Sequence, residues 1–186
     1  MKRFLYSLVY TILPAEWIFG SRSKIENFVD KAVDGRINPG KAITLGCGVG
    51  RETIHLARKG FDVTGLDFSP IAIRRARKKA QAAGLDIPFI VDDLTNLQQV
   101  KGTYDLVMDF GAINDLSQTD RDLYIKNVLP LINPNGHYAM FCFEKMFPSK
   151  EVYRRFQETL AIQILEEKSD FPGTIILYLM TRQKSK

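Results

Sequence analysis

The chemistry-bearing residues that stand out in this chain are three closely spaced glycines and an acid that follows them. Gly46, Gly48 and Gly50 form a G-x-G-x-G stretch directly after an apolar run. Glycine lets the backbone approach a ligand closely and leaves amide groups free to bind it. Asp67 follows 17 residues after Gly50, and a carboxylate there can accept two hydrogen bonds from ribose hydroxyls. Each feature alone could be a turn, but together they favour a nucleoside cofactor.

The spacing of the glycines indicates which kind of nucleoside fits. Dinucleotide sites use G-x-G-x-x-G, with the pyrophosphate over a helix N-terminus. In this chain Arg51 stands where the last glycine of that pattern would fall. The shorter spacing therefore disfavours NAD and NADP.

Alternating strand and helix patterns position the loop and the acid. Predicted strands cover residues 41–45, 61–66, 88–91, 104–110, 137–143, 160–166 and 174–181. Predicted helices cover residues 24–34, 51–59, 70–84, 119–129 and 149–158, with Ser23, Ser69 and Thr119 as N-caps. This alternation predicts an α/β fold: a doubly wound, mostly parallel, seven-stranded Rossmann-like sheet with helices on both faces. The last two strands have no helix between them and are predicted to be antiparallel.

Five motifs in this order carry a resemblance to a known superfamily. They are ITLGCGVG (43–50), GLDFSP (65–70), VDDL (91–94), YDLVMD (104–109) and LINPNG (131–136). From about Lys41 to Glu144 the chain resembles the class I S-adenosylmethionine-dependent methyltransferases. The resemblance implies S-adenosylmethionine as the cofactor.

The resemblance also implies a set of cofactor-binding positions: Trp17, Thr44, Gly46, Cys47, Gly48, Gly50, Asp67, Phe68, Asp93, Leu94 and Asp109. The glycines would line the methionine part of the cofactor, Asp67 would hold the ribose, and Phe68 would lie beside the adenine. Asp93 would accept from the adenine amino group; the alternative is a helix cap for Leu94 onward.

One position departs from the family pattern. The family usually has an acid two residues before the first glycine, and this chain has Thr44. The contacts around the cofactor's amino end would then be rebuilt with water or another side chain.

The N-terminal segment, residues 1–22, is interpreted as a lid on a single domain that covers residues 1–186, with residues 23–186 as its core. A W-x-x-G stretch, 17–20, is similar to one in thiopurine-methyltransferase-like members of the superfamily, where it closes over the cofactor. The alternative is that Trp17 is a core anchor. A cleaved secretory signal is disfavoured because Pro14 and Glu16 follow the apolar run and no A-x-A site is present.

The class of methyl acceptor is predicted from the side chains that are available to position or deprotonate it. Asp109, Asn114 and Asp115 are candidates to position or deprotonate the acceptor, although Asp109 could equally be a turn acid. We expect methyl transfer by in-line displacement to the S, O or N atom of a small molecule, with a thiol favoured because it is partly ionised near neutral pH. The alternatives are an RNA-modifying methyltransferase and a non-catalytic S-adenosylmethionine-binding protein.

Charge and composition bear on partners and location. The net charge of +5 comes largely from one run, Arg74, Arg75, Arg77, Lys78 and Lys79. These residues fall opposite a stripe of alanines on the predicted helix, so the run is interpreted as a solvated face rather than a nucleic-acid patch. Cys47 and Cys142 lack metal-site spacing, and no metal is predicted. The apolar N-terminal stretch is too short to span a membrane, so a cytoplasmic enzyme is expected; no pattern indicates an oligomeric state.

Overall fold

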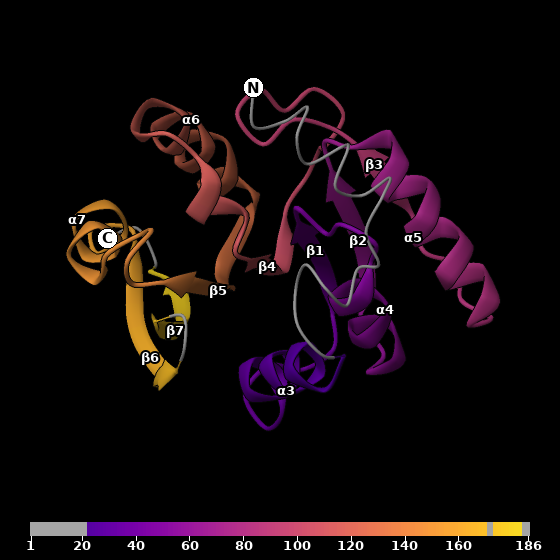
Figure 1. Cartoon of the computed structure of the whole chain (residues 1–186), viewed down its shortest axis with the longest axis horizontal. Helices are drawn as coiled ribbons and strands as arrows, with labels where there is room; N and C mark the ends of the chain where they lie inside the picture. Colours follow the sequence, from indigo (N-terminus) through magenta and orange to yellow (C-terminus); the bar gives the residue numbers. More distant parts are fainter. Residues whose placement is uncertain (1–21, 171–172, 184–186) are drawn as a thin grey trace.

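The computed structural model describes residues 22–170 and 173–183. Its centre is a seven-stranded sheet in the order β3-β2-β1-β4-β5-β7-β6 (Figure 1). The strands are β1 (Lys41–Leu45), β2 (Asp62–Asp67), β3 (Phe89–Val91), β4 (Tyr104–Phe110), β5 (Ile132–Phe143), β6 (Leu160–Asp170) and β7 (Gly173–Arg182). The doubly wound seven-stranded sheet predicted from the sequence is confirmed.

The direction of the strands follows the prediction as well. The pairs among β1 to β5 are all parallel, whereas β7 is antiparallel both to β5 and to β6. Chain order reverses between β1 and β4, which are hydrogen-bonded neighbours at the centre of the sheet. Ligands of open α/β sheets bind beyond the carboxyl ends of the strands at such a reversal, so this edge is where the site is sought.

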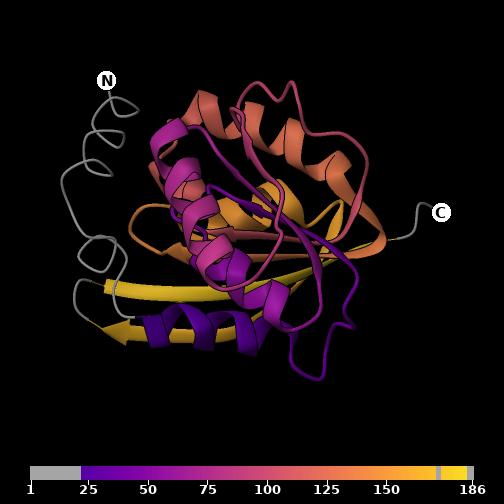
Figure 2. The same cartoon turned by 90° about the vertical axis from the view of Figure 1, so that its right-hand side faces the viewer.

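Helices cover both faces of the sheet. They are α3 (Arg22–Val33), α4 (Arg51–Arg58), α5 (Pro70–Ala82), α6 (Gln118–Val128) and α7 (Ser149–Phe156), with short 3₁₀ turns η1 (Ala112–Asp115) and η2 (Leu129–Leu131). Because strand side chains alternate between faces, Ala42 and Leu106 pack toward α3 and α4, whereas Ile43 and Val107 pack toward α6 and α7. Figure 2 shows α3 running beside the closing strand pair, and Lys31 of α3 forms an ion pair with Glu166 of β6 at 2.6 Å.

Local capping explains why α5 begins where it does. The Ser69 hydroxyl accepts a hydrogen bond from Ala72 N at 3.3 Å, and Pro70 occupies the first turn, where its missing N–H is not needed. The alanine stripe, Ala72, Ala76 and Ala80, is buried against the sheet. Arg74, Arg77, Lys78 and Lys79 of the basic run are exposed and Arg75 is half-buried, which agrees with a solvated face.

Two predicted caps are wrong. Helix α3 begins at Arg22, so Ser23 lies inside its first turn instead of preceding it. Helix α6 begins at Gln118, and its N-cap is Ser117, whose Oγ accepts from Asp120 N at 3.2 Å. Thr119 is therefore a first-turn residue. Ser117 and Thr119 are equally good capping types two residues apart, and the turn η1 just before Ser117 decides between them.

The hairpin at the end of the chain is longer than predicted. Strands β6 and β7 pair from Leu160 with Arg182 to Asp170 with Gly173. Polar residues such as Glu166 and Lys168 extend β6 because its outer edge faces solvent, which hides the strand from a hydrophobicity pattern. Within residues 22–170 and 173–183, no helix is both long and apolar enough to cross a bilayer.

Candidate cofactor and acceptor site

The glycine loop lies at the carboxyl end of β1 in a conformation that requires glycine. Gly46, Gly48 and Gly50 have φ angles of 62°, 53° and 78°, a left-handed region that strains other residues. A Cβ added to Gly46 would lie 2.7 Å from Cβ of Ala112 in η1. The loop after β1 is therefore packed directly against the segment after β4, and these are the two halves of the predicted site.

Asp67 ends β2 beside this loop, as the cofactor prediction requires. Its side chain is 2% exposed; Oδ2 accepts from Gly48 N at 2.8 Å and Oδ1 accepts from Ser69 N at 2.9 Å. Burial raises the pKa of this carboxyl to about 6, against the two backbone hydrogen bonds, which lower it. Each carboxylate oxygen can accept a second hydrogen bond, so two positions suit ribose hydroxyls. Phe68, the next residue, is half-buried.

Asp93 follows β3 and holds a turn instead of a helix. Its Oδ1 accepts from Thr95 N at 2.9 Å and from Thr95 Oγ1 at 2.8 Å. No helix follows, so the alternative of a helix cap is wrong. Leu94 is half-buried against the core on the α6 face. The preceding Asp92 accepts from the backbone of Gln98, Gln99 and Val100 and so fixes the following loop, a role for which its position at a strand end was the only sequence signal.

Asp109, at the end of β4, is fully buried and already bonded. Oδ1 accepts from Ala112 N at 2.6 Å, while Oδ2 accepts from Ile113 N at 3.2 Å and from the Tyr124 hydroxyl at 2.6 Å. Burial raises its pKa to about 6, opposed by these hydrogen bonds. The Tyr124 hydroxyl also lies 2.8 Å from that of Tyr138. These hydrogen bonds indicate that Asp109 holds η1 in position. Its role as a base that deprotonates the acceptor stays a prediction.

The other two candidates for handling the acceptor lie within η1. Asn114 is 5% exposed, and its Oδ1 accepts from Phe143 N at 3.3 Å, which ties η1 to the end of β5. Asp115 is half-buried. Of the three predicted residues, Asp115 is thus the one with an accessible side chain.

Thr44 and Cys47 are buried and turned into the fold. The Thr44 hydroxyl lies 2.7 Å from the hydroxyl of Thr53 in α4, and Thr44 is 0% exposed. Cys47 is 2% exposed, and burial, followed by the charges of Asp67 and Glu52, raises its thiol pKa well above its usual range. Both side chains are thus enclosed in the protein, and their predicted contact with the cofactor stays a prediction.

Glu52 lies beside the predicted site and is not among the residues singled out from the sequence. It follows the glycine loop in the first turn of α4 and is 5% exposed. Burial and then the charges of Asp67 and Asp109 raise its pKa to about 8, while its own backbone N–H and Arg51 lower it. Its spacing of four residues from buried Leu56 places it on the inward side of the helix, and this was the signal available in the sequence.

These residues fit a cationic nucleoside. The glycine loop supplies close backbone approach, Asp67 supplies acceptors for ribose, and three buried carboxyls share the edge between β1, β2 and β4. No cluster of metal-ligating side chains occurs within the described part of the chain. Trp17 and residues 1–21 of the predicted lid lie outside the described residues.

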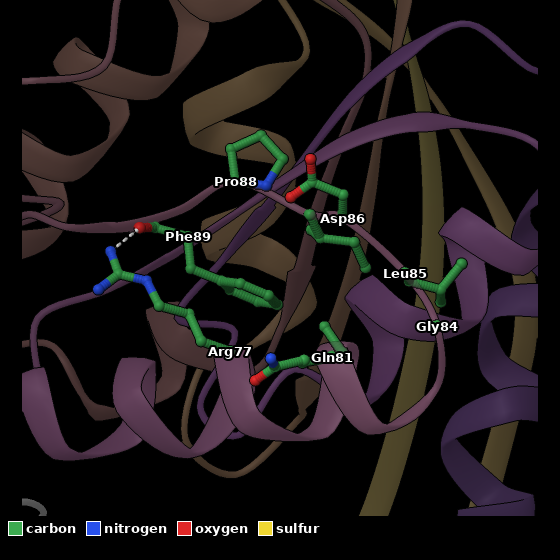
Figure 3. A pocket seen from close by; sticks show the side chains of 9 residues that line it. Arg77, Gln81, Gly84, Leu85, Asp86, Pro88 and Phe89 are labelled. Atoms are coloured by element: carbon green, nitrogen blue, oxygen red, sulfur yellow. Dashed lines mark hydrogen bonds between the residues drawn. The ribbon is translucent and has the colours of Figure 1, made fainter.

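A separate groove of about 700 Å³ lies between α5 and the segment leading into β3 (Figure 3). Residues 84–89 and three side chains of α5 line it, and Arg77 donates to the Phe89 carbonyl across it. None of the predicted cofactor-binding residues lines this groove. It lies along the outer strand β3, so it is distinct from the site at the glycine loop.

Sheet order and loop geometry together define a class, the S-adenosylmethionine-dependent methyltransferases with a Rossmann-like fold. A family model described as a methyltransferase domain matches residues 42–136. The chain belongs to this methyltransferase family, and the matched residues run from β1 to the turn within β5, which includes the glycine loop, Asp67 and Asp109.

Known proteins resemble the chain beyond the family match. Norajmaline N-methyltransferase of Rauvolfia serpentina is 26% identical over 174 residues, which cover 83% of this chain. The match spans 59% of that relative's length. This likeness covers more of the chain than the family model does.

Two solved structures share the fold. The 1,6-didemethyltoxoflavin-N1-methyltransferase of Burkholderia thailandensis, with bound 1,6-didemethyltoxoflavin and S-adenosylhomocysteine, superposes with a TM-score of 0.80 at 15% identity over 98% of this chain and 88% of that one. A structure from work on the conversion of a disulfide bond into a thioacetal group in echinomycin biosynthesis superposes with a TM-score of 0.78 at 21% identity, over 100% and 95% of the two chains.

Proposed function

We propose that this chain transfers the methyl group of S-adenosylmethionine to a nucleophilic heteroatom of a small molecule, with a thiol preferred, by in-line displacement. The observation that carries the proposal is the packing of Gly46 against Ala112. It joins the loop that would bind the methyl donor to the η1 segment that would border the acceptor. Such an arrangement brings donor and acceptor together, and positioning alone can contribute roughly 7–11 kcal/mol to a two-substrate reaction.

The proposed roles follow the geometry of each residue. The backbone of 46–50 lines the methionine part, Asp67 accepts from the ribose hydroxyls, and the segment 93–94 borders the adenine beside Phe68. S-adenosylmethionine supplies a methyl group that is already activated, so the protein has only to align the reactants and exclude water. In the displacement, the sulfur–methyl bond breaks as the acceptor–methyl bond forms, and the acceptor's proton passes to solvent.

A thiol acceptor is favoured because the described site offers little to activate a weaker nucleophile. Asp109 is enclosed by its own hydrogen bonds. His55 lies 2.7 Å from Asp30 on the α3 side, and His137 lies 3.1 Å from the Thr181 hydroxyl. Neither histidine is at the carboxyl edge of β1 and β4. A thiol ionises near neutral pH without a strong base, whereas an unactivated alcohol or amide does not.

The comparisons support a small acceptor without choosing its heteroatom. The named relatives act on nitrogen in two cases, and the third concerns sulfur. The likeness to thiopurine-methyltransferase-like enzymes belongs to this same proposal and rests on the W-x-x-G stretch. We further propose that residues 1–22 close over the site as a lid, with Trp17 against the cofactor, in a single-domain cytoplasmic enzyme.

The test is a panel of acceptors incubated with radiolabelled S-adenosylmethionine. Aryl and alkyl thiols, phenols, catechols, small amines and transfer RNA are assayed with the wild-type chain and with the Asp67→Ala variant as the control with weakened cofactor binding. We expect label on at least one apolar thiol, and much less label with the variant at limiting S-adenosylmethionine. Transfer to RNA with none to any small molecule would overturn the proposal in favour of an RNA-modifying enzyme, and no transfer despite cofactor binding would favour a binding protein.

A further inference from the structure

Glu52 is a buried acid next to the glycine loop. It lies in the first turn of α4, with 5% of its surface exposed. Its hydrogen bond is to its own backbone N–H, and no ion pair joins it to a cationic side chain within residues 22–170 and 173–183. A carboxyl held this far from water, with no cationic partner among these residues, is suited to receive a cationic ligand.

The groups that surround Glu52 come from three elements. Asp67 at the end of β2 and Asp109 at the end of β4 are close enough for their charges to raise its pKa, which burial has already raised, to about 8; Arg51 beside it acts in the opposite direction. Cys47 in the glycine loop has its own pKa raised in part by Glu52. An acid in these surroundings keeps its proton at neutral pH until a cation arrives.

The family position for an acid near the amino end of the cofactor is occupied by Thr44. Its hydroxyl is 0% exposed and is paired with Thr53, at 2.7 Å. Thr44 therefore cannot turn toward a ligand without breaking a buried hydrogen bond. Thr53 is the direct neighbour of Glu52, so the helix that satisfies Thr44 also brings a carboxyl to the same end of the loop.

We propose that Glu52 binds the α-ammonium group of the cofactor's methionyl end, in place of the acid that Thr44 has replaced. This inference rests on the cofactor site proposed above. When the ammonium group enters, the Glu52 proton is released to solvent, and the carboxylate that remains forms a charged hydrogen bond with the ammonium. The acid thus stays neutral in the empty site, because a charged carboxylate there would be repelled by Asp67 and Asp109. It becomes charged in the complex.

Two ligands distinguish the proposed role of Glu52 from the contributions of the other residues of the cofactor site. S-adenosylhomocysteine carries the amino-acid end, whereas 5′-methylthioadenosine has the same adenosine and thioether without it. By calorimetric titration, Glu52→Gln should weaken S-adenosylhomocysteine binding about 10- to 100-fold, the range for a hydrogen bond to a charged group, and leave 5′-methylthioadenosine unchanged. Glu158→Gln, at an exposed position, is the matched control and should alter neither affinity. Glu52→Asp should recover part of the loss.

Proton release provides a second readout that does not depend on a variant. Titration of the wild-type chain at pH 7 in buffers of different ionisation enthalpy should show close to one proton released with S-adenosylhomocysteine and almost none with 5′-methylthioadenosine. Equal release for the two ligands, or full S-adenosylhomocysteine affinity in Glu52→Gln, would overturn the role of Glu52 while leaving the cofactor site intact. Failure of both ligands to bind the wild type would instead overturn the cofactor site itself, and this inference with it.

Discussion

The two halves of the site each end in a buried aspartate, and the two aspartates are used in different ways. At the end of β2, Asp67 accepts one backbone hydrogen bond on each carboxylate oxygen and retains capacity for more. At the end of β4, Asp109 accepts from two backbone amides and from the Tyr124 hydroxyl. The first carboxylate therefore keeps acceptor capacity for the proposed ligand, whereas the second holds its own loop in shape.

This difference shows that position at a strand end does not by itself define a binding residue. Both aspartates lie at the carboxyl ends of strands of one sheet, and burial raises the pKa of each to about 6. The deciding feature is the number of protein donors that already occupy the carboxylate.

The largest effect is expected for Asp109→Ala. Two backbone amides and the Tyr124 hydroxyl would lose their acceptor inside the core, and each unsatisfied buried group costs about 1–3 kcal/mol. We expect the free energy of unfolding to fall by roughly 3–5 kcal/mol, which lowers the melting temperature by about 10 °C or more in a chain of this size. Calorimetry measures this. Unchanged stability combined with lost turnover would make Asp109 a catalytic residue and would remove the contrast.

Asp67→Ala should act mainly on the ligand. The ribose would lose two acceptors, and we expect S-adenosylhomocysteine affinity to fall by about 1.5–3 kcal/mol, the range for hydrogen bonds to a charged group. Asp62→Ala is the matched control, because Asp62 is exposed at the opposite end of the same strand. Titration calorimetry of both variants tests this, and equal affinity for the variant and the wild type would place the ribose elsewhere.

The pH dependence of stability should reflect the buried acids. Asp67 and Asp109 have folded-state pKa values raised to about 6, and Glu52 to about 8. The folded chain thus holds protons that the unfolded chain releases, and stability present at low pH is lost as pH rises through these values.

The slope of the free energy of unfolding against pH tests the raised pKa of Glu52. Between pH 6 and 8 the ligand-free chain should lose up to about 1.4 kcal/mol per pH unit from Glu52. Glu52→Gln should flatten the melting temperature over this range and raise it at pH 8, whereas Glu158→Gln should follow the wild type. A wild-type melting temperature that increases from pH 6 to 8 would contradict the raised pKa values.

The smallest effect is expected for Thr44→Val. Loss of one hydroxyl leaves Thr53 unsatisfied, at a cost of about 1 kcal/mol, and the double change with Thr53→Val should recover most of it because both polar groups are then removed. Cofactor affinity should not change, since the Thr44 side chain is turned away. A weaker affinity in the single variant would return Thr44 to the list of ligand contacts.

The sequence predicted the elements around the cofactor well because their signals are local. The three glycines of the G-x-G-x-G loop have left-handed backbone, and Ser69 with Pro70 is an N-cap and first-turn pair that favours the start of a helix. Strands β1 and β4 have the predicted bounds, since continuous apolar runs between turn residues leave little choice. These features depend on residues that are adjacent in the sequence, so the sequence alone contains the signal for them.

The acceptor half was less predictable because its contacts join distant residues. The bond of Asp109 with Tyr124 spans 15 positions, and that of Asn114 with Phe143 spans 29. The roles of Ser117 as cap and Asp92 as loop anchor depend on the turns that surround them. Glu52 was overlooked because an acid in the first turn of a helix has an ordinary explanation in the helix dipole, and only its burial next to two aspartates sets it apart.

Titration calorimetry of the full chain with S-adenosylmethionine, S-adenosylhomocysteine and NAD tests the proposed cofactor site. The glycine spacing, Asp67 and Glu52 together predict that S-adenosylmethionine and S-adenosylhomocysteine each bind with one ligand per chain at the same site. NAD is predicted not to bind. Binding of NAD with no heat from either methionine nucleoside would contradict the proposed cofactor site. The loop at Gly46 would then bind a pyrophosphate, and the buried carboxyls would have no cationic ligand.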